Sequence, residues 1–341
     1  MPLRRPVVGP VLLAAALASV AALGGCSSGG ASGSSPAGAR SREATSSATP
    51  RAASSGGSLW DRLDRAHAER QSPKESGFVG EADGASQVAP DVRARLEGWW
   101  RAYATHASDW PALKAQWLAA PPPAPALLAE NLLRAHVFAW DAGDRREYER
   151  SRRELAAMPE IAAPLLVEGL AQRAGDAVVR NHAAELLGAM GPSALPAITR
   201  GLENATPRGR WDLVRAVARM KDPGTTDFLT SVLFAPGAYE PRMEAVKGLA
   251  ENGDPRAYDA VVRALQDGDP SVRKFAARYV AGFGRDEAAP ALVACMELCE
   301  RERDREGVEE AHVALRKVTG VDCVPESGAW RARLASRSRA R

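Results

Sequence analysis

The chain has 341 residues, of which 45% are hydrophobic and 26% are charged, and its formal charge at pH 7 is +3. These values are ordinary for a soluble globular protein with one or two domains. Composition alone gives no case for nucleic-acid binding. Arg4 and Arg5 contribute to the positive charge but lie in a segment that we expect to be removed, so the mature chain is close to neutral.

Residues 1–25 show the pattern of a secretory signal peptide. Arg4 and Arg5 form its charged start, and the apolar stretch 7–23 that follows is short for a membrane-spanning helix. Pro10, near the start of this stretch, also argues against a spanning helix. We therefore expect a signal segment that is absent from the mature protein.

The end of this segment, Leu23-Gly24-Gly25-Cys26, resembles the lipobox of bacterial lipoprotein precursors. The resemblance implies cleavage between Gly25 and Cys26 and acylation of the Cys26 thiol. Several acyl chains on one residue suffice for lasting anchorage, at ~0.8 kcal/mol for each buried methylene. Ser27 favours, by the usual sorting pattern of lipoproteins, an outer membrane facing the periplasm if the cell has two membranes. The alternative is a plain secretory signal that happens to contain a cysteine.

Residues 26–57 are predicted to form a lipid-anchored flexible linker. They are almost entirely Ser, Gly, Ala, Thr and Pro, and such a segment cannot bury enough apolar surface to offset its ordering entropy. Its r.m.s. reach is roughly 30 Å. Residues 58–90 are predicted to be mostly disordered or loop, because most of this stretch is polar and contains Gly and Asp.

Residues 91–145 are predicted to form a Trp-rich helical region, because apolar residues recur there at spacings of three and four. A run of three prolines, 121–123, separates the second helical segment from the third. Tryptophans are concentrated here: Trp99, Trp100, Trp110, Trp117 and Trp140. At helical spacing we expect them to pack in a core, and a ligand-binding surface is the alternative.

Residues 146–330 contain an internal repeat. Leu155-Ala-Ala-Met158 recurs 32 positions later as Leu187-Gly-Ala-Met190, and Gly169-Leu170 recurs at the same offset as Gly201-Leu202. The apolar anchors continue at steps of 32, 30, 32, 31 and 35 residues through Leu155, Leu187, Val217, Leu249, Val280 and Leu315. A nearly fixed period in this range indicates a solenoid, in which stacked neighbours complete a shared core.

Each unit is predicted to form two helices. In the clearest unit Asp269 is placed to cap the first helix, Pro270 occupies its first position, and Gly284 permits the turn to the second helix. The runs Asp176-Ala-Val-Val-Arg180 and Asp269-Pro-Ser-Val-Arg273 resemble HEAT repeats, most closely the short bacterial type that also occurs in phycobilin lyases.

This resemblance implies an all-α fold, a right-handed α-solenoid of stacked helical hairpins, preceded by a small helical region and a disordered tether. Trp330 resembles the terminal cap of such bacterial repeat proteins, and residues 331–341 are predicted to be a basic disordered tail.

Four arginines lie seven positions before successive anchors: Arg180, Arg210, Arg242 and Arg273. In HEAT-like repeats, arginine and aspartate side chains of adjacent first helices usually bond across units. The resemblance therefore implies a structural ladder rather than a binding stripe. It also implies that a partner would bind along the second helices.

The chain has three cysteines besides Cys26, and the sequence is compatible with three structural roles for them. In an exported protein Cys323 can form a disulfide with Cys299 or Cys295. Cys295 and Cys299 also lie on a predicted apolar stripe, where free cysteine behaves as a small hydrophobe. The three together with His312 are a candidate zinc set, although their spacing is not that of a known zinc module.

No short catalytic motif is present: there is no HExxH, no Gly-rich phosphate loop after a strand and no GxSxG. We therefore expect no enzyme, cofactor or metal. The sequence predicts an interaction or assembly scaffold anchored in the bacterial cell envelope, with an unknown protein partner and no nucleic acid. The alternatives are an enzyme of the bilin-lyase type, which rests on fold analogy, and small-molecule binding in the Trp-rich region.

Overall fold

The computed structural model describes Trp60, residues 89–172 and residues 177–340. The predicted signal peptide, the lipidation site Cys26 and the linker 26–57 lie outside the described residues. So do Asp176 of the first HEAT-like run and all of the segment 58–88 except Trp60. The predictions made for these parts of the chain stay predictions.

The Trp-rich region forms three helices: α2 (Pro90–Ala104), α3 (Trp110–Leu118) and α4 (Ala124–Asp141). Proline lies in the first turn of each, where its missing N–H costs no hydrogen bond. The run of three prolines separates α3 from α4, as the sequence predicts.

Six first helices and six second helices alternate along the rest of the described chain. The first helices are α5 (Arg145–Ala156), α7 (Ala177–Met190), α9 (Pro207–Ala218), α11 (Tyr239–Glu251), α13 (Pro270–Val280) and α15 (Arg305–Thr319). The second helices are α6 (Pro159–Gln172), α8 (Leu195–Glu203), α10 (Thr226–Leu233), α12 (Ala257–Ala264), α14 (Ala289–Glu302) and α16 (Ser327–Ala340).

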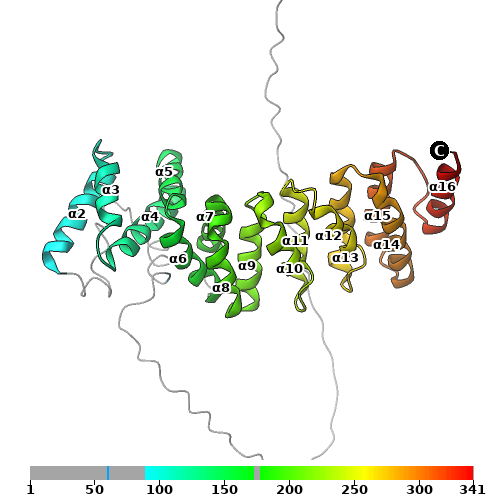
Figure 1. The fold of residues 1–341 in the computed structure, drawn as a ribbon, viewed down its shortest axis with the longest axis horizontal. Helices are drawn as coiled ribbons and strands as arrows, with labels where there is room; N and C mark the ends of the chain where they lie inside the picture. Colours follow the sequence, from blue (N-terminus) through cyan, green and yellow to red (C-terminus); the bar gives the residue numbers. More distant parts are fainter. Residues whose placement is uncertain (1–59, 61–88, 173–176, 341) are drawn as a thin grey trace, which may run out of the picture. The chain divides into compact units, whose positions relative to one another are not determined.

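The helices stack in chain order, and each first helix packs on the next, from α5 on α7 to α13 on α15 (Figure 1). The repeat anchors all lie in the core and are at most 1% exposed: Leu155, Leu187, Val217, Leu249, Val280 and Leu315. The predicted all-α, HEAT-like solenoid is therefore confirmed.

The local signals for helix ends behave as the sequence predicts. The Asp269 carboxylate accepts a hydrogen bond from the Ser271 backbone N–H at 2.8 Å, which caps α13. Gly284 has φ +67°, a left-handed conformation that glycine adopts without strain, at the turn toward α14. Thr206 and Asp304 cap α9 and α15 in the same way as Asp269.

The Trp-rich helices share one continuous core with the repeats. α4 packs along α5 and also contacts α6, so α4 and α5 form a hairpin across the predicted boundary at residue 145. Trp100, Trp110 and Trp117 are buried, as expected for core tryptophans. The Trp-rich region is therefore the N-terminal end of the described stack rather than a separate body.

Trp60 is also part of this core and is only 6% exposed. Its indole lies over Gly169 in α6, so close that a Cβ added to Gly169 would lie 1.6 Å from Cε2 of the indole. The glycine at this repeat position therefore provides the space for a side chain from a distant part of the chain.

The C-terminal tail corrects one prediction. Residues 331–340, predicted to be disordered, continue helix α16, which packs on α14. Two arginines of this helix have partners: Arg331 pairs with Glu297 on α14, and Arg337 donates to the Thr319 carbonyl at 2.9 Å. Trp330, at 0% exposure, fixes the start of the helix in the core.

Within the described part of the chain, none of the helices combines the length and the apolar character that crossing a membrane requires.

Candidate functional site

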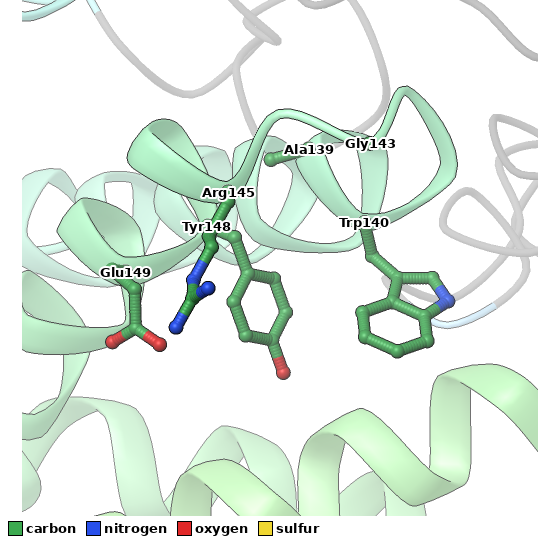
Figure 2. A pocket seen from close by; sticks show the side chains of 6 residues that line it. All are labelled: Ala139, Trp140, Gly143, Arg145, Tyr148 and Glu149. Carbon is green, nitrogen blue, oxygen red and sulfur yellow. The ribbon is translucent and has the colours of Figure 1, made fainter. Parts of the chain in front are cut away.

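The candidate site lies at the turn between α4 and α5. Gly143 has φ +69°, and the Asp144 carboxylate caps α5 by accepting a hydrogen bond from the Glu147 backbone N–H at 3.0 Å. This tight turn brings the last turn of α4 beside the first turn of α5. As a result, the side chains of Trp140 and Tyr148 project in the same direction from the two helices (Figure 2).

Four aromatic side chains from three helices meet here, and we call them the aromatic cluster: His136, Trp140, Tyr148 and His182. The His136 ring stacks on the Tyr148 ring, with centroids 4.1 Å apart. Trp140 lies 5.6 Å from Tyr148 and 5.2 Å from His182, measured between ring centroids. The cluster therefore joins α4, α5 and α7.

Trp140 is exposed although its neighbours are not. Its side chain is 57% exposed, whereas His136, Tyr148 and His182 are all buried. It forms one wall of a hollow of about 360 Å³, and the other lining side chains include Tyr148, Arg145 and Glu149 (Figure 2). An exposed tryptophan beside a hollow is typical of a contact point for a binding partner.

Two buried members of the cluster, His136 and Tyr148, are held uncharged at neutral pH. Burial, and then the nearby His182, lower the pKa of His136 to about 3. Burial, and then a hydrogen bond to Glu185, raise the pKa of Tyr148 above its usual value. The hollow therefore offers neutral aromatic surfaces, with the charges of Arg145 and Glu149 at its rim.

The pKa of His136 predicts how stability depends on pH. Because the folded state disfavours the protonated ring, the unfolded state binds more protons below the unfolded pKa of about 6.5. The stability that His136 contributes by staying neutral is fully present above that pH. This contribution to the free energy of unfolding falls by about 1.4 kcal/mol per pH unit as the pH falls toward 3. Denaturant unfolding between pH 7 and pH 4 should show this slope in the wild type.

The test variant is His136→Gln, which should flatten the slope by about one proton. An unchanged slope in His136→Gln would mean that other groups account for the pH dependence.

The structure confirms only part of the arginine ladder that the sequence predicts. Arg180 on α7 lies 3.3 Å from the Asp212 carboxylate on α9, which does link adjacent first helices. Arg242 pairs at 3.1 Å with Asp267, which lies before the next first helix. Asp269, in contrast, caps its own helix.

The other two arginines of the ladder bind elsewhere. Arg273, almost fully buried, donates to the Asp267 and Gly268 carbonyls and pairs with Glu302 on α14. Arg210 is exposed and donates to the Leu202 carbonyl at 3.0 Å. The side chains that sequence reasoning missed are therefore Asp212 and Asp267. The run Asp267-Gly268-Asp269 was the available signal for the second.

The three cysteines are free thiols in the structure, so the disulfide considered for Cys323 is not formed in it. Cys295 and Cys299 are buried one turn apart on α14, and the position of a Cβ on Gly307 of α15 lies 2.6 Å from the Cys299 sulfur. Both thiols thus face the core. A hydrogen bond between them lowers the pKa of Cys299 and raises that of Cys295.

The described residues contain no group of three or more His, Cys, Asp or Glu side chains arranged to hold a metal ion. His312, considered as a zinc ligand, instead accepts a hydrogen bond from the Trp330 indole at 3.2 Å. Its role in the structure is to bind the cap of the last repeat.

A stack of helix pairs with one anchor residue per repeat and a continuous core defines the class of HEAT-like α-solenoids. The comparison with protein families agrees. The model of HEAT repeats matches residues 235–312, from the turn before α11 into α15, so the chain is similar to HEAT repeats there. A search of curated proteins found no match.

Proposed function

We propose that this protein is a lipid-anchored interaction scaffold of the bacterial cell envelope. The helical repeats support the scaffold role, since α-solenoids present extended surfaces to protein partners. The lipobox-like Leu23-Gly24-Gly25-Cys26 and the linker 26–57 support the anchoring. The observation that carries the binding role is the exposed Trp140 beside its hollow.

The exposed aromatic surface suggests where a partner binds. Trp140, Tyr148 and His182 come from α4, α5 and α7, so their cluster lies on first helices and on the hairpin that precedes them, not on second helices. Val178, one turn before His182 on α7, is 38% exposed and extends the apolar surface. We therefore place the partner at this cluster rather than along the second helices, where the repeat resemblance had suggested it.

The chemistry of the hollow indicates the partner's contact group. Neutral aromatic walls favour an apolar side chain, and Arg145 and Glu149 at the rim favour a neighbouring pair of opposite charges. Tryptophan is enriched among residues whose truncation costs most in interfaces. A partner protein that inserts an aliphatic or aromatic side chain beside Trp140 fits these features.

Anchoring is tested by Cys26→Ala. We expect the wild type to fractionate with membranes and the variant to be released into the soluble fraction, because the acyl chains supply the membrane affinity. Cys323→Ala, which removes a thiol from the end of the solenoid, is the matched control and should stay with the membrane. Equal membrane retention of both variants would contradict lipid anchoring through Cys26.

The binding role is tested by Trp140→Ala. The protein is cross-linked in intact cells and purified, and the wild type should recover one envelope protein. With the variant, the recovered amount of this protein should fall at least about tenfold, which corresponds to an interface hot spot of more than 1 kcal/mol.

The control variant is Phe234→Ala, an exposed aromatic on a distant repeat (37% exposed). It should recover the partner as the wild type does. Recovery that falls equally with both variants, or that persists with Trp140→Ala, would place the interaction elsewhere.

A further inference from the structure

A second hollow also lies along α4, and Ala139 is the one lining residue that it shares with the first. It has a volume of about 240 Å³ and is bounded by α2, by α4 and by the start of α5. Its floor is aromatic: the rings of Trp100 and Tyr103 stack with centroids 4.9 Å apart and 19° between their planes. Phe138 adds a third ring to the lining.

The space exists because the facing side of α4 carries small side chains. Ala135, Ala139 and Ala142 recur at spacings of four and three, so they share one face of the helix and line the hollow together. Larger residues at these positions would fill it. Ala135 and Ala139 are buried, whereas Ala142, the last of the three, is exposed at the entrance.

The charged groups of the hollow are carboxylates. Asp144 and Glu147 line it, together with the exposed His106, and none of the lining residues is lysine or arginine. Arg150, the nearest cation to Tyr103, covers that ring at 3.9 Å but is not among the lining residues. Glu147 accepts the Tyr103 hydroxyl hydrogen bond and also pairs with Arg150 at 3.6 Å, so this arginine offsets its charge.

We infer that this hollow is a binding site for a small organic cation with an aromatic or aliphatic body. The aromatic and small apolar side chains of the lining pack against the body of the ligand, and the Asp144 carboxylate at the edge favours a positive charge. The volume fits a compound with a single ring. This site is separate from the proposed protein-binding surface at Trp140, and either can exist without the other.

The probe is phenethylamine, and the neutral 2-phenylethanol is its comparison compound. The readout is the set of indole N–H signals in the ¹⁵N NMR spectrum of the protein. We expect phenethylamine to shift the Trp100 signal saturably and to leave the Trp140 signal unchanged. We expect 2-phenylethanol, which lacks the charge, to bind about tenfold more weakly.

Two variants test the site in independent ways, one by charge and one by shape. Asp144→Asn keeps a good helix-capping residue but removes a charge, and should weaken phenethylamine binding by about threefold to tenfold. Ala142→Phe fills the entrance and should abolish the Trp100 shift. Glu149→Gln, at the other hollow, is the control and should bind the amine as the wild type does.

The inference is overturned if the Trp100 signal does not move at saturating amine, or if the alcohol shifts it as strongly as the amine. It is also overturned if Asp144→Asn and Ala142→Phe bind phenethylamine like the wild type. Loss of binding in Glu149→Gln alone would assign the amine to the Trp140 hollow instead.

Discussion

Replacing Asp212 with alanine is expected to lower the free energy of unfolding by about 3–5 kcal/mol, because removing one partner of a buried ion pair leaves the remaining charges unpaired. The Asp212 carboxylate is fully buried and lies 2.9 Å from Arg215 and 3.3 Å from Arg180. Both arginine side chains are also mostly covered, at 21% and 11% exposure. Urea unfolding followed by circular dichroism measures the change.

Two further variants separate charge from shape at this position. Asp212→Asn keeps an oxygen that accepts the Arg215 hydrogen bond, and should cost less than the alanine variant. Arg208 lies 3.4 Å from the same carboxylate but its side chain is 47% exposed, so Arg208→Ala should cost less than about 1 kcal/mol. An Asp212→Ala protein as stable as Arg208→Ala would show that the buried pairs contribute little.

The position of Asp212 explains why this effect should reach beyond one repeat. Arg180 belongs to α7, whereas Asp212 and Arg215 belong to α9, so the cluster joins two adjacent first helices. In a solenoid the interfaces between neighbouring units carry much of the stability. Weakening this interface is therefore expected to destabilise the repeats on both sides of it.

Replacing Trp330 with alanine is expected to cost about 3–5 kcal/mol, the usual range for removing a buried tryptophan. Trp330 is fully buried, and its indole donates to His312 on α15 while its helix packs on α14. The variant should lose hydrogen-exchange protection first in α15 and α16, because terminal repeats depend on a cap. Denaturant unfolding and hydrogen exchange measure the two effects.

The control for this prediction is Trp140→Ala. It removes the same side chain, but from a position that is 57% exposed, so its cost should stay within about 1 kcal/mol. Equal destabilisation by the two variants would mean that Trp330 does not act as a cap. Loss of protection spread evenly over the whole stack would point to the same conclusion.

Most of the fold was predictable because its signals are local and repeated. The anchors from Leu155 to Leu315 recur at a nearly constant step, and each is buried in the structure. The cap at Asp269 and the turn at Gly284 follow from the preferences of single residue types for helix ends. Such preferences depend on neighbours within a few positions along the chain, which the sequence shows directly.

The candidate site was not predictable from the same signals. Trp140 ends an apolar stripe and was assigned to the core with the other tryptophans, yet it is the exposed one. Periodicity shows which face of a helix is apolar, but whether the last residue on that face is covered depends on where the neighbouring helices lie. No sequence pattern marks His182, because its ring neighbours, Trp140 and Tyr148, come from other helices.

The sequence by itself therefore determined the class of fold, the period of the repeat and the main helix ends, all of which depend on spacing along the chain. Only the tertiary structure decided that Arg180 pairs with Asp212, that residues 331–340 are helical, and that Trp140 stands open beside a hollow. The physical reason is that pairing, covering and exposure depend on distances between helices. Those distances are set by the packing of side chains from several repeats at once, which no single stretch of sequence contains.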